Sequence, residues 1–123
     1  MKALLLIGVI NGFLAVALGA FGAHGLEGKL SDKMLETWEK AVQYQMFHTM
    51  AIFIAAILLI RFDISSFATA GWTFLIGIIL FSGSLYIYSL TQVKTFAMIT
   101  PIGGVAFLIG WVLIGLGAMK VVG

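Results

Sequence analysis

The sequence has no cysteine, a single proline and few charged residues, and these shortages exclude several classes of protein. Without cysteine there are no disulfide bonds, thiolate metal sites or cysteine nucleophiles. Only 10% of the 123 residues are charged and 62% are hydrophobic, whereas a soluble domain is roughly a quarter charged and half apolar. The formal charge of +2 comes without a Lys/Arg cluster that could neutralise phosphates, so we expect no nucleic acid partner.

Long stretches without charge predict four membrane-spanning helices. Residues 3–23, 64–93 and 95–119 contain no charged side chain, and a hydrocarbon core about 30 Å thick takes roughly 20 helical residues to cross. A fourth stretch, residues 41–60, is apolar except at its beginning. We therefore predict a single transmembrane domain over residues 1–123, with spans at approximately 3–23, 41–60, 67–90 and 96–119.

The N-terminus and the basic residues bear on cleavage and orientation. Lys2 followed by an apolar run resembles a secretory signal peptide, but the run of about 20 residues exceeds the usual 7–15, so we expect an uncleaved helix. With four spans, three Lys or Arg residues lie on the side of the termini and four on the opposite side of the membrane, which leaves the orientation open. Lys2, ahead of the first helix, weakly favours an orientation with both termini inside the cell.

The charged residues concentrate between the first two predicted spans. Residues 24–30 form a glycine-broken connector, and Ser31 is a good N-cap with Asp32 in the first turn. Apolar residues then recur at helical spacing, with charged residues on the other side. We predict an interfacial amphipathic segment, with Trp38 and Tyr44 as interface anchors, that continues bent or straight into the span 41–60.

The single proline leaves two alternatives for the start of the fourth helix. The helix begins either near Phe96, with a kink at Pro101, or at Pro101 itself, with Thr100 as its N-cap. Proline is favoured at the first helical position, but membrane helices also tolerate kinks.

Small residues recur at intervals of seven in all four predicted spans. In lipid, apolar faces gain little by meeting one another, so helices associate where small residues allow close approach. A strict seven-residue repeat keeps one seam facing its neighbours in a left-handed supercoil. We predict an all-α, left-handed four-helix bundle that packs at Gly8, Gly12, Gly19, Gly22, Gly77, Ser84, Gly103, Gly110 and Gly117.

Four polar residues form a candidate cluster. His48 shares a stripe with small residues and Gln45 lies three residues before it, so both are expected to face the interior. Tyr44 lies one turn before His48, and His24 ends the first span at the membrane face where the second begins. We predict that His24, Tyr44, Gln45 and His48 gather near one interface, where their simplest role is to hydrogen-bond helices together.

An inward-facing histidine in a membrane is also a functional candidate. One alternative is a minimal transporter or channel that uses His48 and Gln45. Another is a subunit that binds haem or quinone through His24 and His48. The chain lacks the phosphate-binding loop, the zinc-protease motif and a Ser-His-Asp set. We therefore expect no enzyme activity and assign no catalytic, cofactor-binding or metal-binding residue.

Four motifs follow one another along the chain: GAFGAHGL (residues 19–26), AVQYQMFH (41–48), LFSGSLY (80–86) and ITPIGG (99–104). Together with Gly110-Trp111, they resemble the signature of the YwdK/YgdD family of small bacterial membrane proteins. This family is catalogued as domain of unknown function 423 and has a eukaryotic relative called transmembrane protein 256. The resemblance covers nearly the whole chain.

The resemblance implies a multi-pass protein of a bacterial plasma membrane with about four spans. It also implies an envelope role, because a staphylococcal member is associated with membrane integrity. It implies no enzyme activity, substrate or cofactor, and His24, Tyr44, Gln45 and His48 match motif positions that have no assigned chemistry. We expect a non-enzymatic envelope protein that supports membrane integrity through helix packing and through contacts with lipid, with further copies of itself or with other membrane proteins.

Overall fold

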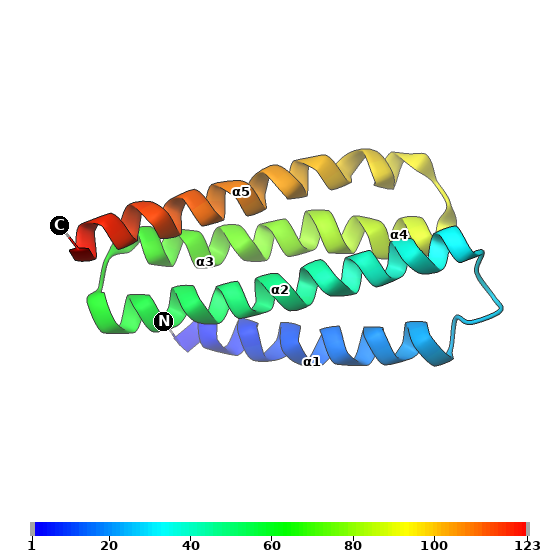
Figure 1. Ribbon diagram of the computed structural model, residues 1–123, viewed down its shortest axis with the longest axis horizontal. Helices are drawn as coiled ribbons and strands as arrows, with labels where there is room; N and C mark the ends of the chain where they lie inside the picture. The colour runs from blue at the N-terminus through cyan, green and yellow to red at the C-terminus, as the bar shows by residue number, and fades with distance from the viewer. Residues whose placement is uncertain (1, 123) are drawn as a thin grey trace.

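The structure, a computed structural model, describes residues 2–122 as four long helical rods that run antiparallel in sequence order (Figure 1). No strand occurs within these residues. Each rod is long and apolar enough to cross a membrane, which confirms the prediction of an all-α four-helix membrane bundle. The elements are α1 (Lys2–His24), α2 (Asp32–Phe62), α3 (Ser65–Gly77), the π-helical segment η1 (Ile78–Ser82), α4 (Gly83–Thr91) and α5 (Lys94–Val122), with α3, η1 and α4 forming one rod.

Local sequence signals explain where α2 begins and where α2 and α4 end. The side-chain oxygen of Ser31 accepts a hydrogen bond of 3.2 Å from the N–H of Met34, as an N-cap does. Asp63 and Gln92 adopt left-handed conformations, with φ of 51° and 57°, and each donates its N–H to the carbonyl four residues earlier. These caps stop the helices and allow the chain to reverse within a few residues.

α2 is one continuous helix, so the residues predicted as an interfacial segment form its first turns. Their apolar side is covered by neighbouring helices, because Met34 and Trp38 are only 4% and 3% exposed. The indole N–H of Trp38 donates to the carbonyl oxygen of Leu18 in α1, at 2.9 Å. Trp38 therefore joins two helices, and its ring is not exposed at a membrane interface as the sequence had suggested.

α5 begins at Lys94 and contains Pro101 within it, which decides between the two predicted starts in favour of the longer helix. Just after the proline, a methyl group added at Gly103 would collide with the backbone of Leu80 and Phe81 in η1. The backbones of α5 and η1 therefore approach each other directly. Only a residue without a side chain allows this contact.

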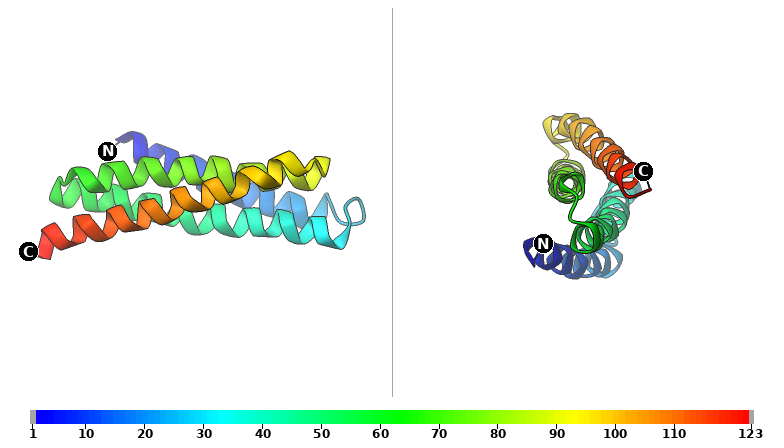
Figure 2. Two further views of the ribbon diagram at one scale, coloured as in Figure 1. Left: turned by 90° about the horizontal axis from the view of Figure 1, so that it is seen from above. Right: turned by 90° about the vertical axis from the view of Figure 1, so that its left-hand side faces the viewer.

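The four rods form an open bundle. α1 packs on α2, α2 packs on the α3–η1–α4 rod, and that rod packs on α5. Within residues 2–122, α1 and α5 do not pack on each other, and the end-on view in Figure 2 shows the two helices on opposite sides of the bundle. The predicted left-handed supercoil stays a prediction.

Aromatic rings on one rod lie over glycines on the next. Phe67 and Phe74, seven residues apart on α3, face Gly117 and Gly110, which are seven apart on α5. A methyl group added at either glycine would lie 2.5 Å from the nearest ring carbon, closer than real contacts allow. Phe107 of α5 fills the space over Gly77 of α3 in the same way. The small residues thus provide recesses, and the phenylalanines that fill them are the part of the seam that the glycine pattern did not predict.

The α1–α2 pair uses the same arrangement. A methyl group added at Gly8 would lie 2.8 Å from the ring of Phe53, and one at Gly22 would collide with the indole of Trp38. Gly19 and Gly12 face smaller side chains of α2, at 3.3 and 3.7 Å from the added methyl. The contact is tight at both ends of the pair and looser in its middle.

Candidate functional site

A chain of hydrogen bonds crosses three helices and surrounds Gln45, which is 4% exposed. The Tyr86 hydroxyl of α4 donates to Oε1 of Gln45 at 2.7 Å, and Nε2 of Gln45 donates to Oδ1 of Asn11 in α1 at 3.1 Å. Nδ2 of Asn11 then donates to the Ile7 carbonyl at 2.9 Å. Each amide group both donates and accepts, so the chain ties α1, α2 and α4 together and leaves both amides paired.

His48 joins α2 to α5. Its Nδ1 lies 2.9 Å from the Tyr44 carbonyl, and the indole N–H of Trp111 donates to its Nε2 at 3.2 Å. A carbonyl can only accept and an indole N–H can only donate, so the two contacts together require a neutral imidazole with its proton on Nδ1. The ring also stacks on Phe107, with 3.5 Å between centroids and 8° between planes.

Hydroxyl groups make two further hydrogen bonds between helices. Ser82 of η1 donates to the Ala41 carbonyl of α2 at 2.8 Å, and the oxygens of Ser84 and Thr100 lie 2.6 Å apart between α4 and α5. Among the residues that the structure describes, every buried side-chain nitrogen or oxygen has a hydrogen-bond partner. Some of these partners are on another helix, as for Gln45, and others are on the same helix, as for Thr49 and Ser89.

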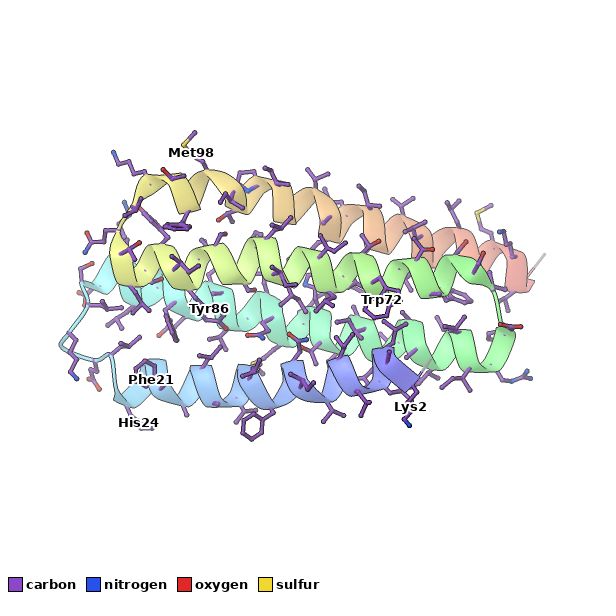
Figure 3. The ribbon with its side chains drawn as sticks, turned by 180° about the vertical axis from the view of Figure 1, so that it is seen from behind. Lys2, Phe21, His24, Trp72, Tyr86 and Met98 are labelled. Atoms are coloured by element: carbon purple, nitrogen blue, oxygen red, sulfur yellow. The ribbon has the colours of Figure 1, made fainter. Side chains whose placement is uncertain are left out.

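The structure does not bring the four predicted cluster residues together. His24 ends α1 at the protein surface, and Figure 3 shows it pointing away from the bundle. Gly22 faces Trp38 in the antiparallel α1–α2 pair. His24 lies two residues closer to the connection, level with residue 36 of α2, and is therefore about twelve residues of α2, or roughly 18 Å, from the level of His48. The prediction that the two histidines approach each other is wrong, because His24 lies at the end of α1 and His48 lies near the middle of α2.

The three cluster residues on α2 also divide between two sides. Gln45 turns toward α1 and α4, whereas His48 turns toward α5. Tyr44 is 41% exposed, and its ring lies 4.4 Å from that of Phe81 and 6.1 Å from that of His48. Because α2 meets α1 and α4 on one side and α5 on another, positions three residues apart on it reach different neighbours. A pair of histidines that could hold haem is absent from residues 2–122, and so is any group of three or more metal-binding side chains.

Sequence reasoning missed three partners of the buried polar groups: Asn11, Tyr86 and Trp111. Asn11 could have been predicted from the sequence, because it is the one polar side chain in residues 3–23. A polar residue within a membrane span usually has a buried partner. Tyr86 and Trp111 lie in apolar stretches, where aromatic rings often serve packing alone. A buried tyrosine hydroxyl or indole N–H normally finds a hydrogen-bond partner, but the sequence does not say which one.

Two grooves on the outer surface flank the exposed side of α2. The α2–α5 groove has a volume of about 730 Å³ and is lined by Tyr44, Phe47, His48, Gly104, Phe107 and Trp111, among others. The α1–α2 groove has a volume of about 500 Å³ and is lined by Gly12, Val16, Gln43, Met46, Phe47 and Met50, among others. Gln43 and Phe47 line both grooves, so they form a ridge between them.

The apolar surface, the four spanning helices and the internal hydrogen bonds define a small multi-pass membrane protein. The model of a family described as "Protein of unknown function (DUF423)" matches residues 18–104. The chain therefore belongs to the DUF423 family, which confirms the family that the sequence motifs indicated.

Full-length relatives agree with this assignment. The chain is 53% identical to the UPF0382 membrane protein YwdK of Bacillus subtilis (strain 168), over 98% of each chain. It is 49% identical to a UPF0382 membrane protein of Staphylococcus aureus (strain bovine RF122 / ET3-1), over the full length of both. No solved structure matches the chain. The relatives' names state a membrane protein and give no activity, ligand or partner.

Proposed function

We propose that the protein is a non-enzymatic component of the bacterial plasma membrane that supports membrane integrity through its contacts with lipids or other membrane proteins. The observation that carries the proposal is the complete pairing of the buried polar side chains in residues 2–122. Catalysis or transport needs groups that can meet a substrate. In this interior, Gln45, His48 and their partners are already bonded to one another.

The outer surface supports the same proposal. Large apolar side chains cover it, including Phe13 and Met98, which are both 74% exposed. In a bilayer these side chains meet acyl chains or the apolar faces of other membrane proteins. With the buried polar groups paired and large apolar groups outward, the contacts that remain for function are those of the surface.

A deletion strain of the bacterium that carries this gene tests the proposal. We expect the deletion to raise the uptake of a dye that enters only through damaged membranes, and to increase sensitivity to envelope stress. The wild-type gene should reverse both effects. Normal dye uptake and normal stress resistance in the deletion strain would contradict the proposed role.

A carrier that uses His48 and Gln45 predicts a different result. Purified protein in liposomes would then conduct protons or small solutes, and His48→Phe or Gln45→Leu would abolish the flux. We expect no flux that depends on either side chain. The variants should instead lower stability, as described in the Discussion.

A further inference from the structure

One exposed face of α2 carries a cation, two polar side chains and an aromatic ring in order of depth. Gln43, Tyr44 and Phe47 follow Lys40 at spacings of three, four and seven residues, so all four share this face. Lys40 is the last charged residue before the apolar stretch 41–60. Glu36 and Glu39 precede it on the side of the connection, so we place the boundary of the membrane on this face at Lys40.

Gln43 and Tyr44 are polar groups that the protein itself leaves unpaired. Within residues 2–122, neither the Gln43 amide nor the Tyr44 hydroxyl has a hydrogen-bond partner on another side chain or on the backbone. They lie roughly 5–6 Å below Lys40 at 1.5 Å per residue. The interfacial layer on each side of the hydrocarbon has a similar thickness, roughly 5–8 Å. Donors left without acceptors at this depth are costly, and lipid esters are the acceptors present there.

Two apolar grooves run inward from these donors. The α2–α5 groove, about 730 Å³, and the α1–α2 groove, about 500 Å³, lie on either side of the ridge formed by Gln43 and Phe47. A single-chain or ring-shaped molecule would fill only one of them. A molecule with two acyl chains would fill both and place its branching point at the ridge.

We propose that this face of α2 binds one two-chain phospholipid. Its phosphate lies at the Lys40 ammonium, its ester carbonyls accept hydrogen bonds from Gln43 and Tyr44, and one acyl chain occupies each groove. The inference rests on the proposed function only in that both assign a role to lipid contacts. A lysine holds phosphate as a point charge, so the site recognises the phosphate and the esters that phospholipids share.

Filling one groove tests the placement of the acyl chains. A methyl group at Gly104 would meet only the Phe81 ring, at 3.9 Å. Gly104 lines the α2–α5 groove, so the rest of the side chain in Gly104→Leu takes up space within that groove. Gly115→Leu is the matched control, because it makes the same change on α5 at a position with no atom within 4 Å of the added methyl. Both proteins are purified after exchange into vesicles of phosphatidylethanolamine and phosphatidylglycerol with defined chains, and native mass spectrometry counts the retained lipids. We expect one retained phospholipid in wild type and Gly115→Leu, and its loss in Gly104→Leu.

Removing the polar contacts tests the placement of the headgroup. We expect Lys40→Gln to lower phospholipid retention about tenfold and Tyr44→Phe to lower it severalfold, as for the loss of charged and neutral hydrogen bonds. Lys29→Gln, in the connection before α2, removes the same charge elsewhere and should have no effect. Thermal unfolding in detergent, with no variant less stable than wild type, separates lost binding from lost folding.

The measurement distinguishes this site from the broader proposed function. Equal lipid retention in wild type, Gly104→Leu and Lys40→Gln overturns the site, and so does a retained quinone or single-chain lipid, or no retained lipid at all. None of these results depends on the dye-uptake phenotype of the deletion strain. That phenotype tests the envelope role separately, and its absence would leave the mass spectra unaffected.

Discussion

From the connection between α1 and α2 to the middle of the bundle, neighbouring helices are joined by hydrogen bonds. Toward the termini they are joined by apolar packing. Within residues 2–122, the side-chain hydrogen bonds between helices start at Trp38 and Tyr86 and reach no farther than the Gln45–Asn11 and His48–Trp111 pairs. The terminal half is held by a cluster of Leu4, Ala56, Leu59 and Phe67.

The difference shows two ways in which a helix can select its neighbour in a membrane, where burying apolar side chains gives little driving force. Apolar packing works only where shapes fit, which is why glycines lie beneath aromatic rings. Hydrogen bonds add directional specificity, but each group in the hydrocarbon must find its partner within the protein, because acyl chains supply none. The predictions below test whether the terminal half depends on shape alone and the other half on polar pairing as well as shape.

The largest effect is expected from removing a ring in the terminal half. Phe67 is fully buried and fills the recess over Gly117. Phe67→Ala leaves a cavity there and should lower the free energy of unfolding in detergent by about 3–5 kcal/mol. Phe13→Ala is the control, because Phe13 is 74% exposed and its loss should change stability by less than about 0.5 kcal/mol. Similar losses in both variants would show that the recess contributes nothing specific.

A second test adds one methyl group to either of two adjacent glycines in α5. Gly103→Ala places the methyl group against the backbone of η1, which cannot move as a side chain can, and should destabilise the fold by about 1–3 kcal/mol. At Gly104 the nearest atom is 3.9 Å from the added methyl, so Gly104→Ala should be neutral or stabilising by up to about 1 kcal/mol. Thermal unfolding of the pair measures the contrast. Equal stability would refute the close approach of α5 and η1.

In the polar half, Gln45→Leu removes two hydrogen bonds between helices and leaves Tyr86 and Asn11 without their partner. We expect a loss of about 1–2 kcal/mol, within the range measured for such bonds in membrane proteins. Gln43→Leu makes the same change two residues earlier on an exposed surface and should have little effect on stability. A double-mutant cycle of Gln45→Leu with Tyr86→Phe should show coupling, and strict additivity would exclude the bond.

The smallest effect is expected at the boundary between the two halves. His48→Phe keeps a flat ring against Phe107 but removes the acceptor for the Trp111 indole. The loss should be about 0.6–1 kcal/mol, because much of the packing survives. Tyr88→Phe, which removes a hydroxyl from α4 without touching His48, serves as the comparison. A loss of several kcal/mol at His48 would mean that the ring does more than join α2 to α5.

Three residues show which structural features can be predicted from the sequence and which cannot. Ser31 was predicted as an N-cap and acts as one, because capping depends on neighbouring residues alone. His24 was placed beside His48 on the argument that adjacent spans meet at one face. That argument ignores depth, and one residue lies at a helix end while the other lies well inside α2. Asn11 was overlooked, although an amide in an apolar span predicts a buried partner.

The sequence by itself determined the number of spans, their approximate limits and the small residues on their faces, because these follow from charge, length and periodicity along the chain. Tertiary structure decided which ring lies over which glycine, that Gln45 and His48 reach different neighbours, and that α1 and α5 stay apart. Those outcomes depend on the rotation and depth of each helix relative to the next. Many arrangements satisfy the same hydrophobic pattern, and only the packed helices select among them.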